Sequence, residues 1–236
     1  MSDFGLTDGY VAQVKARILS EFPDLTIVDI THDLDAYDIL SGAWLISTTY
    51  TAFPGGAIHL AVVDPGVGTS RRPLIVEKAG HTFVGPDNGL FSFLYPADTV
   101  TSITWRPPGA ISPSFHGRDL FAPMVIRLLS GATPLELGDA LPDPISMDIA
   151  SPRVVHIDRF GNIVTNIRPE QLQGHSLIIQ GRNLKEIKET FADLPKNGLG
   201  LIVGSAGTVE IVARQDHAAR RLDARVGMPV AIAPAP

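Results

Sequence analysis

The chain has 236 residues, of which 44% are hydrophobic and 19% charged, a balance typical of a globular protein with a sizeable apolar core. Its formal net charge of −6 argues against nucleic-acid binding, which normally requires a basic surface. The sequence has no cysteine, no N-terminal signal core and no apolar window long enough to span a bilayer. We therefore expect a cytoplasmic protein with no disulfide, no thiolate metal site and no membrane partner.

The first part of the chain alternates between helical and strand patterns. Apolar residues at helical spacing predict helices over 7–19, 39–50 and 117–129. Apolar runs predict strands over 25–30 and 57–63, and a hairpin over 74–77 and 81–85. Because helices and strands alternate, we expect residues 1–140 to form an α/β domain with a largely parallel central sheet.

The character of the sequence then changes. Four prolines (Pro134, Pro142, Pro144 and Pro152) punctuate a stretch with little periodicity, and we interpret residues 141–152 as a linker. Beyond it, short β-rich runs separated by Gly, Asn and Asp turns cover 154–157, 163–167, 177–179, 199–203, 209–212 and 229–232. This pattern is typical of a small β-barrel or sandwich, so we expect residues 153–236 to form a barrel-like all-β domain.

The loop that follows strand 57–63 is the most informative stretch of the chain. The strand ends in Asp64, and a Pro-Gly-Val-Gly-Thr loop follows at once. Glycines let a backbone approach a ligand closely, and functional residues often lie on loops after strand ends. Arg71 follows Asp64 by seven positions, which is far enough for the loop to fold back and pair the two side chains. An ordinary turn with a surface ion pair remains the alternative.

Other polar clusters each have a structural alternative. Asp3 and Asp8 precede the first helix, where carboxylates also serve as simple caps. Asn88 lies in an Asn-Gly pair after a strand, which is a turn signal, and His116 stands at a helix start, where a histidine is more often a cap than a catalyst. The histidines show no metal-ligand spacing, and neither a dinucleotide fingerprint nor a phosphate-binding loop is present.

Taken in order, the motifs resemble one family. They are Ser-Asp-Phe-Gly-Leu-Thr-Asp-Gly-Tyr, Ile-Thr-His-Asp, Val-Asp-Pro-Gly-Val-Gly-Thr, Gly-Pro-Asp-Asn-Gly, Phe-His-Gly-Arg-Asp, Asp-Arg-Phe-Gly-Asn and Ser-Ala-Gly. This ordered set closely resembles the adenosine-forming S-adenosyl-L-methionine hydrolases, also called hydroxide adenosyltransferases, which are related to fluorinating and chlorinating enzymes. The resemblance runs from Asp3 to about Ile211, nearly the whole chain.

The resemblance implies that water or hydroxide attacks C5′ of S-adenosylmethionine and releases adenosine and methionine without a cofactor or metal. The family uses an Asp–Arg–His set, and the matching residues are Asp64, Arg71 and His116. A sulfonium leaves as a neutral thioether, so the difficulty lies in aiming a weak nucleophile rather than in protonating a leaving group. A neighbouring cation weakens a carboxylate as a base, so we expect Asp64 to orient and polarise the water more than to deprotonate it.

The same resemblance assigns substrate-binding roles. Asp3 is expected to bind the ribose hydroxyls, and Asp8 to lie near the methionine end. Asp158 matches the position that meets the substrate ammonium, Asn162 the one that reads adenine, and Ser205 the one that holds the methionine portion. Phe191 is a candidate to stack on adenine, and Asn88 is also assigned to the site. The family architecture implies a homotrimer with active sites at subunit interfaces.

Two departures from the family pattern stand out. An apolar strand usually precedes the Asp-Phe-Gly segment, whereas only Met1 and Ser2 stand there, and we interpret this start as incomplete. Halogenating relatives have an arginine after the serine of the C-terminal turn, whereas this chain has Ala206, so we expect backbone N–H groups to hold the substrate carboxylate.

Three alternatives remain at this point. A halide transferase on the same fold is disfavoured because a carboxylate at position 64 would repel a halide in a dry site. A non-catalytic S-adenosylmethionine or adenosine binding module would bind tightly without turnover. A metal-dependent hydrolase is disfavoured by the absence of ligand spacing.

Overall fold

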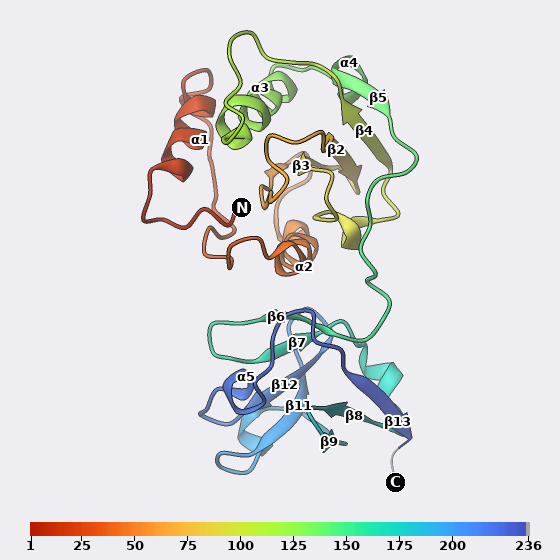
Figure 1. Ribbon diagram of the computed structural model, residues 1–236. Helices are drawn as coiled ribbons and strands as arrows, with labels where there is room; N and C mark the ends of the chain where they lie inside the picture. The colour runs from red at the N-terminus through yellow and green to blue at the C-terminus, as the bar shows by residue number, and fades with distance from the viewer. Residues whose placement is uncertain (235–236) are drawn as a thin grey trace. The chain divides into compact units, whose positions relative to one another are not determined.

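The computed structural model describes residues 1–234, which fall into two compact units (Figure 1). The first unit spans Met1–Met147 and the second begins at Asp148. Residues 235 and 236, the end of the predicted C-terminal domain, lie outside the described residues. Among residues 1–234, no helix has the length and apolar character needed to cross a membrane.

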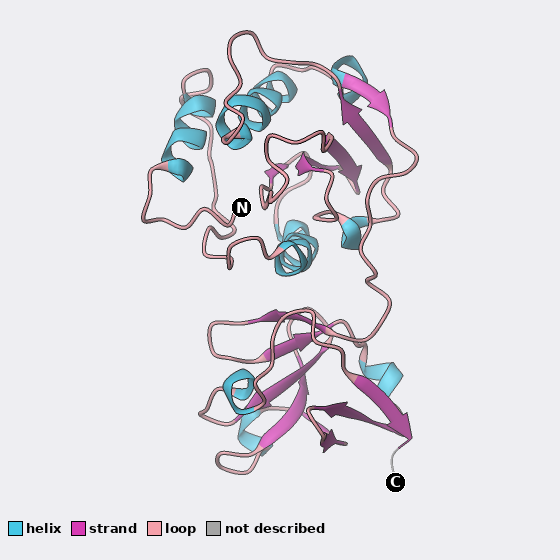
Figure 2. Cartoon of the chain, in the orientation of Figure 1, coloured by secondary structure: helices cyan, strands magenta, loops and turns pink. Residues whose placement is uncertain are grey.

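The first unit carries a mixed sheet between helices (Figure 2). Its helices are α1 (Tyr10–Leu19), α2 (Ile39–Thr49), α3 (Ala122–Leu129) and α4 (Pro134–Leu137), with short helical turns η1 (Tyr50–Ala52), η2 (Ser92–Leu94) and η3 (Gly117–Phe121). Its strands are β1 (Ile58–Leu60), β2 (Pro73–Lys78), β3 (His81–Pro86), β4 (Thr99–Ile103) and β5 (Gly138–Ala140), in the spatial order β1-β3-β2-β4-β5.

The prediction of a largely parallel sheet is wrong. Among the strand pairs of this sheet, β1–β3 is parallel, whereas β3–β2, β2–β4 and β4–β5 are antiparallel. The reason is local connectivity. The β2–β3 hairpin turns at Ala79 and Gly80, both of which have positive φ, and a hairpin necessarily joins antiparallel strands. The sheet is therefore mixed.

The predicted strand at 25–30 does not join any sheet. Its apolar pattern is that of a buried strand, but none of its residues pairs with a strand among residues 1–234. The predicted strand at 57–63 is present as the shorter β1, Ile58–Leu60, with an isolated parallel bridge between Ser2 and Val62 beyond it.

Side chains alternate across this sheet and build two apolar layers. Ile75 and Val84 face α1 and α3, where they pack with Val14 and Met124. Residues on the opposite face, among them Leu74, Val76 and Phe83, pack with Ile46 of α2. The sheet is thus covered by α1 and α3 on one face and by α2 on the other.

The helix predicted over 117–129 begins with a π-helical turn. Residues Gly117–Phe121 form this turn directly after His116, and regular α-helix follows from Ala122. A π turn is a local widening of the helix and is often found at functional sites. It places the wide first turn immediately beside His116.

The second unit consists mainly of β-strands packed around a large apolar cluster, with a smaller second cluster of Leu194, Ile202 and Val212. Its strands are β6 (Val154–Ile157), β7 (Ile163–Thr165), β8 (His175–Ile179), β9 (Arg182–Leu184), β10 (Ile187–Lys188), β11 (Leu199–Val203), β12 (Val209–Ala213) and β13 (Ala231–Pro234). The helical turns are η4 (Pro169–Leu172) and η5 (Phe191–Asp193), and the one α-helix among its described residues is α5 (Ala218–Arg221).

The all-β character of this unit is as predicted, but its strands do not close into a barrel within the described residues. They form a five-stranded sheet, β10-β11-β12-β7-β6, and a three-stranded sheet, β13-β8-β9. Leu201 and Ile211 of the first sheet and Leu177 of the second share one buried cluster. Two open sheets that face a common core are sandwich-like.

Candidate active site

Asp64 and Arg71 form a buried ion pair in the loop after β1. The Arg71 Nε donates to Oδ1 of Asp64 at 2.9 Å and to Oδ2 at 3.0 Å, and the second guanidinium nitrogen, Nη2, also bonds Oδ2. The two side chains are only 4% and 8% exposed. Arg71 also lies over the ring of Phe121, 4.9 Å from its centroid. The carboxylate is therefore held in one orientation by a guanidinium that is itself packed in place.

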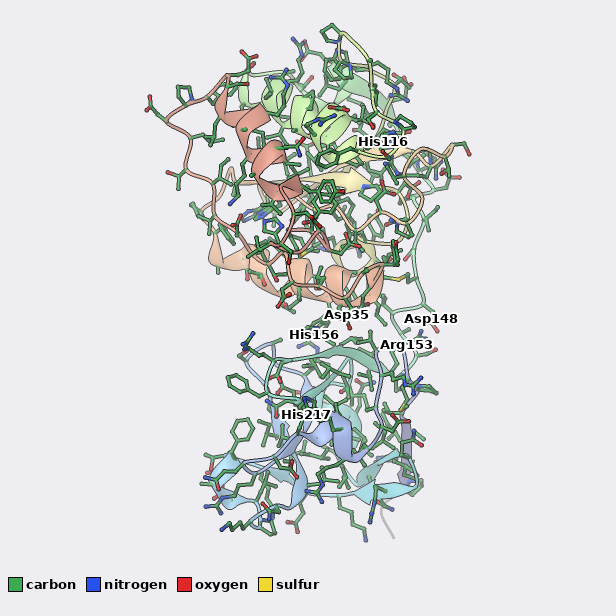
Figure 3. All side chains as sticks on the ribbon, turned by 60° about the vertical axis from the view of Figure 1, so that its left-hand side comes forward. Asp35, His116, Asp148, Arg153, His156 and His217 are labelled. Carbon is green, nitrogen blue, oxygen red and sulfur yellow. The ribbon has the colours of Figure 1, made fainter. Side chains whose placement is uncertain are left out.

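His116 joins this pair through the same guanidinium. Figure 3 labels His116 in the first unit. Arg71 Nη2 lies 2.8 Å from Nδ1 of His116. An arginine only donates, so Nδ1 accepts, and a neutral ring then carries its proton on Nε2. Burial, followed by the charge of Arg71, lowers the pKa of His116 below its ordinary value. The site thus favours a neutral imidazole whose Nε2 is a donor.

Gly68 explains why the Asp64 loop needs a glycine in its middle. Its φ is +77°, and a Cβ at this position would lie 2.3 Å from the carbonyl oxygen of Pro113. The loop therefore packs its backbone against the segment that leads into His116. This contact brings Asp64 and His116, which are far apart in the sequence, to the same place.

A cavity of about 270 Å³ opens at this cluster. Asp64 and His116 line it, together with Asp3 and Tyr37. Oδ2 of Asp3 accepts a hydrogen bond from the backbone N–H of Tyr37 at 2.8 Å, and Tyr37 has a positive φ of 69°. A left-handed conformation is costly for a tyrosine, so the contact with Asp3 helps to hold it there.

Aromatic side chains form one wall of the cavity. Phe4, Tyr10 and Phe115 meet edge to face, with ring centroids 5.2 to 6.1 Å apart. Such a wall offers apolar surface and ring edges beside the charged pair. It is suited to an organic ligand with a flat, partly apolar body.

Two further residues assigned from the sequence lie outside this cavity. Asp8 is exposed in the loop before α1. Asn88 uses its side-chain amide to donate to the carbonyl oxygen of Val63 at 2.8 Å, and its own oxygen accepts from the Leu90 N–H. Asn88 therefore braces the residue that precedes Asp64 and does not line the cavity.

Arg72, next to Arg71, points elsewhere. Its Nε donates at 2.7 Å to Asp87, whose side chain is only 1% exposed. The other oxygen of Asp87 accepts from the backbone N–H of Ile145 at 2.8 Å. The two adjacent arginines thus serve different carboxylates, one in the cavity wall and one beneath the end of the first unit.

In the second unit, Asp158 and Asn162 form a closed turn. Asp158 accepts from the backbone N–H groups of Phe160 and Asn162 at 2.9 and 2.8 Å, and from the side-chain amide of Asn162 at 2.8 Å. Gly161 has a φ of +83°, and a Cβ there would lie 2.1 Å from the ring of His217. Both predicted residues are therefore brought together by a turn that requires glycine.

The other two residues predicted in the second unit are open to solvent. Phe191 is 45% exposed at the start of η5, and Ser205 is exposed in the turn between β11 and β12. Glu210 was missed by the sequence reasoning. Its carboxylate packs against Gly204, and burial, with a further effect from Asp158, raises its pKa. A lone Glu in a strand gives no sequence signal for such a place.

Two comparisons with family models cover most of the chain. Residues 1–138 match the model of the SAM hydroxide adenosyltransferase N-terminal domain, and residues 152–231 match that of the C-terminal domain. The chain belongs to the SAM hydroxide adenosyltransferase family. Here SAM stands for S-adenosyl-L-methionine.

Curated relatives carry two kinds of name. An (R)-S-adenosyl-L-methionine hydrolase of Thermus thermophilus is 34% identical, over 98% of this chain and 96% of the relative. A protein of the same name from Methanocaldococcus jannaschii is 33% identical, over 94% and 90%. A fluorinase of Actinopolyspora mzabensis is 25% identical, over 98% and 95%. The hydrolases are thus more similar to this chain than that fluorinase is.

Two solved structures share the fold of this chain. A crystal structure of a Thermotoga maritima protein has a TM-score of 0.88 and 28% identity, with 98% of each chain covered. A second, of a Thermus thermophilus protein, has a TM-score of 0.83 and 35% identity, with 98% of this chain and 97% of the other covered.

The residues that line this cavity and were not predicted from the sequence include Tyr37, Phe4 and Phe115. Tyr37 gave no signal because nothing in its neighbours requires a positive φ, whereas Phe4 and Phe115 directly adjoin Asp3 and His116 and could have been found from those motifs. No group of three or more His, Cys, Asp or Glu side chains suited to a metal ion occurs among residues 1–234.

Proposed function

We propose that this protein hydrolyses S-adenosyl-L-methionine to adenosine and L-methionine. Family membership and the names of the Thermus and Methanocaldococcus relatives support this substrate and reaction. The observation that carries the proposal is the Asp64 carboxylate, fixed by Arg71 beside neutral His116 at the wall of a cavity.

The reaction is a displacement at C5′. Water forms the new C5′–O bond as the C5′–S bond breaks, and the bonding pair leaves with sulfur to give the neutral thioether of methionine. The sulfonium charge ends as one proton released from the attacking water. Because the leaving group needs no proton, the protein contributes mainly by positioning the water and by accepting its proton.

Asp64 is the proton acceptor in this scheme. Its oxygens are already bonded by Arg71, and each carboxylate oxygen has a further lone-pair direction for a water. The guanidinium stabilises the carboxylate as an anion and so weakens it as a base. Asp64 therefore orients and polarises the water, and the proton moves fully to it only as the C–O bond forms.

His116 acts as a donor in the same scheme. Arg71 occupies Nδ1, so the proton on Nε2 is free to donate to the oxygen of the water or to an oxygen of the substrate. A carboxylate that accepts from the water and an imidazole that donates to it together fix the direction of attack. Protonation of His116 would displace the Arg71 hydrogen bond and disorder all three groups.

The substrate-binding roles follow from the family resemblance. Asp3 binds the ribose hydroxyls, with Tyr37 beside it, and the aromatic wall faces the apolar parts of the nucleoside. Asp158 meets the ammonium group, Asn162 reads adenine, and Ser205 holds the methionine portion. Asp8 and Phe191 complete the set near the methionine end and on the adenine face, and Asn88 supports the site through the Val63 carbonyl.

We further infer a homotrimer and a cytoplasmic protein that uses no cofactor. Leu6 and Tyr37, near Asp3, are 74% and 70% exposed, and association would cover such apolar side chains. Light scattering coupled to size-exclusion chromatography would test the trimer, and a monomeric variant is expected to be inactive. Cell fractionation would test the location, and activity is expected to survive EDTA.

Chromatography of S-adenosylmethionine incubated with the protein tests the reaction. Wild type is expected to yield adenosine and methionine, and Asp64→Ala none. Added fluoride or chloride is expected to give no 5′-halogenated nucleoside, because a buried carboxylate repels a halide. Binding without turnover in wild type would instead indicate a non-catalytic binding module.

A further inference from the structure

The short helix α5 is joined to the turn that carries Asp158 and Asn162. Ala218 and Ala219, its first two residues, lie in the large apolar cluster of the second unit, which fixes the start of the helix. The backbone N–H of Ala219 donates to the carbonyl oxygen of Gly161 at 2.9 Å. The first turn of α5 therefore holds the backbone of Gly161 directly.

His217, the residue before α5, makes two contacts of different kinds. Its Nδ1 accepts a hydrogen bond from the backbone N–H of Arg220 at 3.2 Å, so the side chain caps the helix. The same ring covers Gly161, where a Cβ would lie 2.1 Å from Nδ1 and 2.2 Å from Cγ of His217. The imidazole therefore fills the space that a side chain at position 161 would otherwise take.

Gly161 is the residue of the turn that most needs such support. It directly precedes Asn162, so its backbone sets where the Asn162 side chain begins. Its φ is +83°, and a glycine can leave such a conformation for others at little cost. The ring of His217 and the N–H of Ala219 together restrict this residue, and so they restrict Asn162.

The turn also fixes the direction in which the Asn162 amide points. Oδ2 of Asp158 accepts from the amide nitrogen Nδ2 of Asn162 at 2.8 Å, and an ionised carboxylate can only accept. The amide oxygen Oδ1 is therefore turned away from Asp158, and no group among residues 1–234 donates to it. Because Asn162 is only 6% exposed, Oδ1 is an unused acceptor held in one direction.

We propose that His217 is a positioning residue that makes the enzyme select a 6-amino purine over a 6-oxo purine. The proposal rests on the proposed function, in which Asn162 reads adenine. The 6-amino group of adenine donates to an acceptor such as Oδ1, whereas a 6-oxo group only accepts and would face that oxygen without a hydrogen bond. Unpaired polar groups in a closed site are costly, so the discrimination depends on keeping Oδ1 where the turn holds it.

The test compares S-adenosyl-L-methionine with its 6-oxo analogue, S-inosyl-L-methionine. His217→Asn and His217→Ser keep an oxygen that can accept from the Arg220 N–H but remove the ring from Gly161, and either one serves if the other does not fold. His217→Phe keeps a ring and removes the acceptor. His175→Asn is the matched control, because His175 is exposed and lies on β8 in the other sheet. For each chain, kcat and KM are measured with both substrates, and the binding of adenosine and inosine is measured by calorimetry.

Wild type is expected to prefer the adenosyl substrate in kcat/KM by about tenfold or more. His217→Asn and His217→Ser should lose most of that preference, mainly through a higher KM for the adenosyl substrate, whereas His217→Phe and His175→Asn should keep it. If the Asn and Ser variants lower kcat/KM equally for both substrates, the residue is merely structural and the proposal is overturned. A preference lost equally in His217→Phe would also overturn it, because the effect would then belong to the helix cap and not to the ring.

The binding measurements separate this proposal from the proposed function. If wild type turns over neither substrate, hydrolysis is wrong as the function, and the ratio of the adenosine and inosine affinities then tests His217 in the same variants. Equal affinities of wild type for the two nucleosides would overturn the proposal whatever the activity.

Discussion

Arg71 is predicted to set the pH range in which the enzyme works. Its guanidinium lies 2.8 Å from Nδ1 of His116, and it lowers the pKa of that imidazole together with burial. Burial is the larger cause, and the charge of Arg71 lowers the pKa further. Arg71→Met should therefore raise the pKa of His116 and move the acidic limb of the kcat/KM profile to higher pH.

The direction in which the acidic limb moves depends on which protonation form of His116 is active. The active form is the neutral ring, which accepts a hydrogen bond from Arg71. Activity is therefore lost as the pH falls through the pKa of His116. If that pKa is higher, the loss begins at a higher pH. Asp64 acts on His116 in the opposite direction, since its charge raises that pKa. Residual activity of Asp64→Asn should therefore have its acidic limb at lower pH than wild type.

The assay is adenosine release measured across the acidic and neutral range, with kcat/KM reporting the free enzyme. Arg71→Lys is the matched control. It keeps the charge, so its limb should stay near that of wild type, while its rate falls because one ammonium cannot replace a planar fork that bonds Asp64 and His116 together. Arg71→Met also leaves a buried carboxylate unpaired, at a cost of about 3–5 kcal/mol, so folding is checked by circular dichroism. The reasoning would be refuted if the acidic limb of the kcat/KM profile of Arg71→Met lay at the same pH as that of wild type, or at a lower pH.

Two further predictions concern stability and the loop. His59, 5% exposed and 3.2 Å from His81, has a pKa lowered by burial to about 4, against 6.5 when exposed. The unfolded chain then binds the extra proton, so unfolding free energy should fall by roughly 3 kcal/mol as pH drops from 6.5 to 4. Urea titrations at several pH values should show that His59→Phe removes most of this loss. The prediction would be contradicted if the free energy of unfolding of the variant depended on pH as steeply as that of wild type. Gly68→Ala should abolish turnover and lower the unfolding midpoint, because the new Cβ would meet the Pro113 carbonyl oxygen. Gly109→Ala is the matched control, since Gly109 also has a positive φ but nothing lies within 4 Å of a Cβ there. It should lower the free energy of unfolding only by the backbone cost of about 1 kcal/mol.

The sequence predicted elements whose signal is local. The helix α3 and the β2–β3 hairpin follow from apolar spacing and a Gly-containing turn, and both are present. Periodicity does not state which strands pair, however, so the mixed sheet was missed. The segment 25–30 shows the same limit, since its residues form a strand pattern but no neighbour pairs with them.

The candidate site was only partly predictable from residues. A loop of seven residues after a strand made the Asp64–Arg71 pair a reasonable prediction, and the structure joins the two side chains. From its position alone, His116 is better explained as a helix cap, and only the family resemblance indicated a catalytic role. The positive φ of Tyr37 accompanies a hydrogen bond from its backbone N–H to Asp3, which lies 34 positions away in the sequence, so no local pattern indicates it.

The opposite directions of Arg71 and Arg72 have a consequence for how this stretch can change. Consecutive side chains of an extended backbone alternate, so a deletion or insertion of one residue just before β2 would turn the wrong guanidinium toward Asp64 and leave Asp87 without its partner. A point substitution in the loop between Asp64 and Arg71 leaves each arginine facing its own carboxylate, whereas a change in loop length does not. In an alignment of this family, the number of residues between Asp64 and the two arginines should therefore indicate better than their identity whether both ion pairs are kept.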